Sequence, residues 1–299
     1  MIFGLTMAVI KKGYPRLRSR FGKLTGYIAL VRPFTLLSPL LAGILGVLAT
    51  TSFSMEKLMV AIYVGVTLAS CQAAGQVINQ YADASLDKLV KQYRPIPSGL
   101  ISKEEALGVG WLLALFSVAR AFTITISFGL LTVLLLFFAV FYSLSPLSPR
   151  RIHPVLNIFW MAISRGFIPV MAVWSIYGHW VSALPYAWIA FVWVLGFQGT
   201  KDLEDVEADK QFGIKTLPGE FGSFGLVMWM VACTFILVCS IFLTQLLIMF
   251  ALVPLAIFSI WGFNRKSKFT ENTYGWLGFY AGLGVFFILL FSNQFFLKS

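Results

Sequence analysis

Residues 57–87 read KLMVAIYVGVTLASCQAAGQVINQYADASLD, an apolar run that ends in three oxygen-bearing side chains. The run over 57–81 is long enough to cross a membrane, because a crossing helix needs about 20 apolar residues. Asn79, Asp83 and Asp87 follow one another at four-residue spacing, so on a continued helix they share one face. The stretch therefore predicts a membrane helix whose end carries a stripe of oxygen donors.

The rest of the chain has the same apolar character. Of its 299 residues 59% are hydrophobic and 12% are charged, and the mean hydropathy is +0.84, which is typical of an integral membrane protein. We expect residues 26–299 to form a single transmembrane domain after a basic interfacial segment at 1–25. The expected fold is all-α with nine transmembrane helices, at residues 26–51, 57–81, 104–121, 124–143, 154–177, 183–200, 222–243, 246–263 and 273–296.

The basic residues set the expected orientation, since Lys and Arg collect in cytoplasmic loops. With the N-terminus inside, eighteen of the 23 basic residues lie on the inner side and three on the outer side, while Arg32 and Arg165 fall within spans. We therefore expect a multi-pass protein of the cell membrane with a cytoplasmic N-terminus, cytoplasmic acidic loops and an external C-terminus. The net charge of +11 follows mostly from this arrangement, and nucleic acid is not expected as a partner.

A second acidic cluster, Asp202-Leu-Glu-Asp-Val-Glu-Ala-Asp209, follows the sixth expected span. Asp202, Asp205 and Asp209 form a stripe like the first one, and the two clusters hold seven of the twelve acidic residues. Aligned carboxylates destabilise a helix by roughly 0.2–0.5 kcal/mol per pair, and a divalent cation reverses that sign. Mg²⁺ takes one or two carboxylates together with water and phosphate oxygens. We expect both clusters to face one cytoplasm-side cavity and to bind a metal–diphosphate complex.

Basic residues accompany both clusters. Lys91 and Arg94 follow the first cluster, Lys201 precedes the second, and Arg32 lies in the first span. Arg can hold a phosphate with two hydrogen bonds and Lys acts as a point charge, so these residues are candidates for binding a diphosphate. The alternative is a solvated, salt-bridged loop, which is the usual fate of charge runs. Arg165 is expected to face a polar cavity, or else to pair with a structural acid or carbonyl.

Three sequence patterns together resemble the UbiA-type intramembrane prenyltransferases. They are N-x-x-x-D-x-x-x-D at 79–87, R-P-I-P-S-G-L-I-S at 94–102 and K-D-x-E-D-x-E-x-D-x-x-x-G-x-x-T-L-P at 201–218. The resemblance implies a nine-helix fold around a lateral prenyl-binding cavity, in which two Asp-rich motifs hold Mg²⁺ and an isoprenyl diphosphate. On the matching positions, the implied catalytic metal ligands are Asp83, Asp87, Asp205 and Asp209, with Asn79 and Asp202 assisting.

The same resemblance supplies diphosphate ligands. Lys91 and Arg94 occupy the family's basic positions before the P-x-P-S-G turn. Tyr142 starts its Y-x-x-x-K element, but Pro stands where the Lys is expected. Arg150 or Arg151 is expected to substitute for that Lys.

The implied reaction is prenyl transfer, in which metal and bases neutralise the diphosphate, the allylic C–O bond ionises and a nucleophile captures the cation. Phe137, Phe138 and Phe141 are candidates for lining the prenyl tunnel. We expect a geranyl or geranylgeranyl diphosphate donor and a lipophilic acceptor, geranylgeranylglyceryl phosphate of archaeal-type ether lipids, with an aromatic quinone precursor or chlorophyllide as alternatives. A cation-coupled transporter is the alternative from another class, although its acids should lie nearer the bilayer midplane.

Overall fold

The structure is a computed structural model that describes residues 22–270 and 272–298. Most of the predicted interfacial segment at 1–25, namely residues 1–21, lies outside the described residues. Regular structure in the described part is helical, apart from one bridge between Lys266 and Thr273. Two shorter apolar helical stretches are Ile126–Phe141 (α8) and Leu247–Trp261 (η4 and α15). Seven helical stretches in these residues are long and apolar enough to cross a membrane: Pro33–Thr50 (α4), Met55–Ala82 (α5), Lys103–Phe122 (α7), Pro154–Ser175 (α10, η2 and α11), Trp180–Asp202 (α12 and η3), Leu217–Thr244 (α14) and Tyr274–Asn293 in α16. The all-α membrane prediction is confirmed.

The first expected span, 26–51, is wrong as a single helix. The chain forms α3 (Lys23–Val31) and α4, and it bends between them at Arg32, whose φ of 52° is left-handed. Pro33 causes the break, because proline disfavours the α conformation in the preceding residue and suits the first position of a helix. The bend places Arg32 on the wall of the interior pocket.

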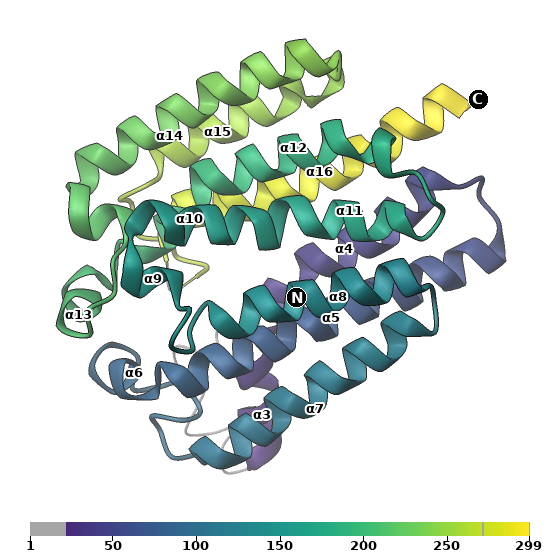
Figure 1. Ribbon diagram of the computed structural model, residues 1–299. Coiled ribbons are helices and arrows are strands. Elements are labelled where there is room, and N and C mark those ends of the chain that lie inside the picture. Colours follow the sequence, from purple (N-terminus) through teal and green to yellow (C-terminus); the bar gives the residue numbers. More distant parts are fainter. Residues whose placement is uncertain (1–21, 271, 299) are drawn as a thin grey trace.

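Helices α4 and α5 pack closely against each other, as expected for membrane helices with small residues at the contact (Figure 1). A Cβ atom on Gly43 would lie 2.4 Å from the Cα atom of Gly65, so the approach requires glycine. Large apolar side chains such as Leu115, Phe235 and Leu243 are exposed on the outer surface. A lipid environment accounts for that exposure, because it would be costly in water.

Helix α12 (Trp180–Phe197) lies at the centre of the core and contacts α11 (Ile168–Ser175), α14 and α16 (Tyr274–Lys298). Trp193 is fully buried, and its indole Nε1 donates a hydrogen bond to the carbonyl of Phe279 at 3.0 Å. Gly282 makes room for this ring, since a Cβ atom there would lie 1.8 Å from Cζ2 of Trp193. The contact fixes α16 against α12 on one side of the pocket.

Three short helices gather at one end of the long helices, on the left in Figure 1. They are α6 (Ala84–Val90), α9 (Pro149–Ile152) and α13 (Val206–Gln211). Helices α6 and α13 contact each other, and Leu86, Ala208 and Ile214 form a small apolar cluster at this contact. The two acidic motifs, far apart in the sequence, are thereby brought to the same end of the molecule.

Candidate active site

A pocket opens between these short helices and extends among α4, α5, α8 and α16. Both acidic clusters and all the predicted bases except Arg151 line this pocket. The predicted site residues on its wall are Arg32, Asn79, Asp83, Asp87, Lys91, Arg94, Tyr142, Arg150, Lys201, Asp202, Asp205 and Asp209.

The two clusters share a local geometry. Asp83 ends α5 and precedes α6, and Asp205 ends the turn after η3 (Gln198–Asp202) and precedes α13. One turn further on, the amide of Asp87 donates to the carbonyl of Asp83 at 2.8 Å, and the amide of Asp209 donates to that of Asp205 at 2.7 Å. Each motif therefore presents one aspartate at a helix break and a second aspartate one turn into a short helix.

Bases neutralise four of the five pocket aspartates. Lys91 follows the first cluster but pairs with Asp205 of the second, so the two motifs are joined by an ion pair. The Nη1 atom of Arg94 lies 2.9 Å from both carboxylate oxygens of Asp87. The pairs are Asp83–Arg150, Asp87–Arg94, Asp202–Lys201 and Asp205–Lys91.

This pairing decides what the carboxylates can hold. Within the described ranges, no group of three His, Cys, Asp or Glu side chains stands close enough to hold a metal ion by itself. Yet Oδ1 of Asp205 is buried without a hydrogen-bond partner, which leaves a lone pair directed at no protein atom. Because Mg²⁺ needs only one or two carboxylates when phosphate and water complete its shell, this donor set fits a metal that binds together with a phosphorylated substrate.

Burial and neighbouring charges shift the pKa values of three groups in the short helices and the turns beside them. Burial raises the pKa of Asp209 to about 7, and the neighbouring charge of Asp202 raises it as well. Burial also raises the pKa of Asp87, although the charge of Arg94 opposes the shift. Burial acts to lower the pKa of Arg150, but its ion pair with Asp83 outweighs this and raises it, so the guanidinium stays charged.

Arg150 takes the position beside the tyrosine of the incomplete Y-x-x-x-K element. Its guanidinium lies 5.3 Å from the ring centre of Tyr142, whose hydroxyl accepts a hydrogen bond from Lys201 at 3.2 Å. Arg151 instead points away from the pocket and donates to the carbonyl of Phe212 at 3.4 Å. Of the two candidate substitutes for the missing Lys, the structure brings Arg150 to the site.

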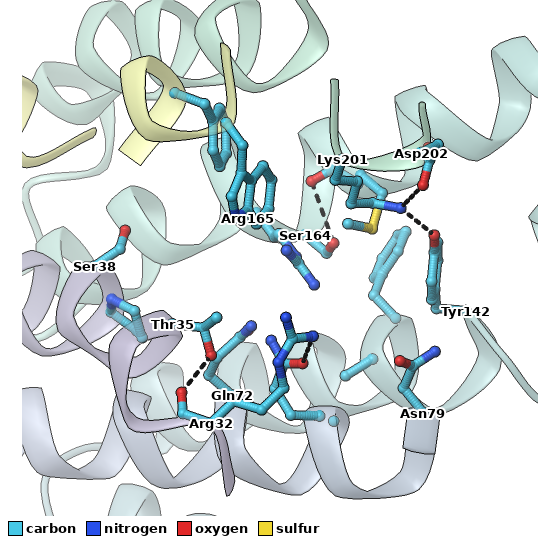
Figure 2. Close-up of a pocket in the computed structure, with 18 of the residues that line it drawn as sticks. Arg32, Thr35, Ser38, Gln72, Asn79, Tyr142, Ser164, Arg165, Lys201 and Asp202 are labelled. Atoms are coloured by element: carbon cyan, nitrogen blue, oxygen red, sulfur yellow. Dashed lines mark hydrogen bonds and ion pairs between the residues drawn. The ribbon is translucent and has the colours of Figure 1, made fainter. Parts of the chain in front are cut away.

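A second polar region lies further along the pocket and is visible in Figure 2. Arg165 sits in a π-helical turn, η2 (Ile163–Phe167), and lines the pocket, as expected for an arginine within a span. Gln72 and Gln76 of α5 also line it and were missed in the sequence. The sequence spacing could have identified them, because they continue the helical face of Asn79 at steps of three and four residues.

Aromatic and aliphatic side chains from α8 and α16 cover another wall of the pocket. Phe138 lines it, whereas Phe137 and Phe141 do not, so the predicted trio is only partly correct. The sequence did not predict that the last helix forms part of the pocket wall. That helix supplies Trp276, Phe279, Tyr280, Leu283 and Phe287.

Comparisons with known proteins identify the family of this chain. The model of the UbiA prenyltransferase family matches residues 36–287. The digeranylgeranylglyceryl phosphate synthase of Methanoregula boonei is 30% identical over 70% of this chain and 73% of its own length, and the bacteriochlorophyll synthase 34 kDa chain of Chloroflexus aurantiacus is 26% identical over 69% and 67%. A structure of a UbiA homologue from Archaeoglobus fulgidus bound to DMAPP and Mg²⁺ has the same fold, with a TM-score of 0.69, 21% identity and coverage of 90% and 98%. This chain belongs to the UbiA prenyltransferase family.

Proposed function

We propose that this prenyltransferase moves an isoprenyl group from a geranyl or geranylgeranyl diphosphate to geranylgeranylglyceryl phosphate within the membrane, with Mg²⁺ as cofactor. The observation that carries the proposal is the convergence of two aspartate motifs and their bases on one pocket at the ends of apolar helices. Several relatives of about 30% identity are named digeranylgeranylglyceryl phosphate synthases, which supports this acceptor.

The aspartates are proposed to hold the metal. Asp83 and Asp205, at the two helix breaks, and Asp87 and Asp209, one turn later, offer their carboxylates from opposite sides of the pocket, with Asp202 nearby. Bound Mg²⁺ supplies positive charge that stabilises the departing diphosphate. The carboxylates must be ionised to act as ligands, and a cation beside Asp209 favours that form.

The bases are proposed to exchange partners when the donor binds. Lys91, Arg94, Arg150 and Lys201 neutralise four of the aspartates in the structure. When those carboxylates serve as metal ligands, the four bases would be free to contact diphosphate oxygens. Two further groups are proposed to bind the diphosphate donor. They are the hydroxyl of Tyr142 and the side-chain amide of Asn79, which donates a hydrogen bond to Asp83 at 2.9 Å.

The transfer itself breaks one bond and forms one. The allylic C1–O bond of the donor breaks, and its electron pair leaves with the diphosphate. The acceptor's hydroxyl oxygen bonds to C1 and passes its proton to the released diphosphate, which yields an ether. The aromatic wall formed by Phe138, Trp276 and Tyr280 supplies π faces toward positive charge and excludes water that would otherwise capture the cation.

We further propose nine crossings with the N-terminus and the active-site loops in the cytoplasm. The proposal rests on the distribution of Lys and Arg and on the two shorter apolar helices, α8 and α15, that join the seven longer ones. A membrane-impermeant maleimide should label Lys88→Cys only after cells are opened, whereas Ser52→Cys should react in intact cells. The reverse pattern would contradict this orientation.

One experiment separates the possible acceptors. Purified protein is incubated with labelled geranylgeranyl diphosphate, Mg²⁺ and, in parallel, geranylgeranylglyceryl phosphate, chlorophyllide or an aromatic quinone precursor. We expect labelled ether lipid with the first acceptor. The Chloroflexus relative favours chlorophyllide as the second candidate, and transfer to it alone would overturn the proposed acceptor. Membership of a prenyltransferase family replaces the transporter interpretation.

A further inference from the structure

Arg165 is the side chain that the proposed chemistry leaves unexplained. It lies within the apolar stretch Pro154–Ser175, where a charged side chain is costly and normally faces a polar cavity or a ligand. No hydrogen bond or ion pair holds its guanidinium in the part of the chain that the structure describes, although it borders the pocket. Four of the five pocket aspartates already have bases of their own, so an anion from outside the protein is the missing counterpart.

A second guanidinium faces the same space. Figure 2 shows Arg32 reaching into the cavity from the wall opposite Arg165, and the two charges are close enough to repel each other. Arg32 donates to the side-chain oxygen of Gln76 at 3.4 Å, and its left-handed backbone is held by two hydrogen bonds from Thr35 to its carbonyl, at 2.8 and 2.9 Å. A non-glycine residue in this conformation is typical of functional positions, where surrounding contacts maintain an unfavourable geometry.

Neutral hydrogen-bonding groups complete the region. Gln72, Gln76, Ser164 and Tyr280 line the pocket around the two arginines, and none of them brings a negative charge. Gln76 precedes Asp83 by seven residues on α5, so at 1.5 Å per residue it lies about 10 Å along the helix from the proposed metal site. The region is therefore a cationic site beyond Asp83, although Asp202, itself paired with Lys201, is near enough to act on the charge of Arg165.

We infer that Arg165 and Arg32 bind the phosphate monoester of the acceptor lipid and thereby select acceptors with that group. This inference rests on the proposed function, because it assigns a place to the acceptor's phosphate. A phosphomonoester carries about −1.5 to −2 charges at neutral pH, and two guanidinium groups match both its charge and its oxygen geometry. A neutral acceptor would leave the charge of Arg165 uncompensated in a site of low dielectric constant.

The test measures binding without the reaction. Purified protein in nanodiscs is titrated with labelled geranylgeranylglyceryl phosphate, with the corresponding lipid alcohol that lacks phosphate, and with geranylgeranyl diphosphate, for wild type, Arg165→Gln and Arg165→Lys. Arg265→Gln serves as the control, because Arg265 is exposed in a loop outside the pocket. Loss of charge-assisted hydrogen bonds should weaken binding of the lipid phosphate in Arg165→Gln by about 10- to 100-fold, with partial recovery in Arg165→Lys.

Binding of the lipid alcohol and of the diphosphate donor should change little. Equal weakening for the lipid phosphate and the alcohol would overturn the inference, as would a loss confined to the donor, which would assign Arg165 to the diphosphate. Transfer assays on the wild-type protein distinguish failure of the proposed phosphate site from failure of the proposed function. Phosphate-selective binding without ether formation would refute the proposed function and keep the site, whereas ether formation with unweakened binding in Arg165→Gln would refute the site and keep the function.

Discussion

Replacing Arg94 with methionine should destabilise the unliganded protein, because the buried carboxylate of Asp87 would lose its ion-pair partner. The side chains of Arg94 and Asp87 are only 10% and 2% exposed, and both carboxylate oxygens lie 2.9 Å from Nη1 of the arginine. Removing one partner of a buried pair costs about 3–5 kcal/mol, because an uncompensated charge remains. Methionine keeps much of the apolar volume, so we expect Arg94→Met to lower the free energy of unfolding by about this amount.

The loss should depend on pH. Burial already raises the pKa of Asp87, and Arg94 is the main group that opposes this shift. A folded-state pKa above the unfolded value means that stability falls as pH rises through the folded pKa. In Arg94→Met the fall becomes larger, so the destabilisation relative to wild type should be greater at pH 8 than at pH 4.

Unfolding free energies can be obtained by titrating the detergent-solubilised protein with sodium dodecyl sulfate at both pH values. In Arg94→Met/Asp87→Asn the unpaired charge is absent, so most of the lost stability should return. Lys88→Met, an exposed site on the same short helix, is the control and should stay near wild type. Additive losses in the double variant, or a loss that does not change between pH 4 and pH 8, would refute the reasoning.

Three further predictions follow from the geometry. The pKa of Asp209 is about 7 in the folded protein against an ordinary 3.8, so its contribution to the free energy of unfolding should fall as pH rises between these values. Unfolding titrations of Asp209→Asn should lack this part of the pH dependence. Gly282→Ala should lose about 1–3 kcal/mol through overpacking against the buried indole, whereas Gly284→Ala, with open space around it, should keep its melting temperature. Arg150→Lys should raise the KM for the diphosphate donor, because a bidentate grip is lost. Arg151→Lys, outside the pocket, should leave that KM unchanged, and equal effects of the two would remove Arg150 from the donor site.

The sequence was a good guide to what depends on local pattern. Hydropathy located the apolar helices, because each must satisfy its backbone hydrogen bonds internally. The spacing of Asp83 and Asp87, repeated with the same residues at 205 and 209, pointed to the candidate site, because residues one helical turn apart lie close together. The break at Arg32 was missed, although the proline that follows it encodes the break locally.

Other features depend on tertiary contacts that no local pattern carries. Lys91 pairs with Asp205, a partner 114 residues away, and nothing near either residue specifies this choice. Arg150 and Arg151 are neighbours of the same type, and only the orientation of a four-residue helix separates the one in the pocket from the one outside it. The wall supplied by α16 comes from the far end of the chain, beyond the motifs that drew attention to the site.

The most direct test of the account is prenyl transfer by folded Asp83→Ala and Asp205→Ala variants, one from each motif. Each is incubated with labelled geranylgeranyl diphosphate, geranylgeranylglyceryl phosphate and Mg²⁺, beside wild type with and without excess chelator. We expect ether formation by wild type and loss of it in chelator. In both variants we expect a rate lower by on the order of 100-fold or more, because each lacks a ligand where charge is neutralised. Undiminished transfer by either folded variant, or by wild type in excess chelator, would contradict the claim that the two aspartate motifs share one metal–diphosphate complex.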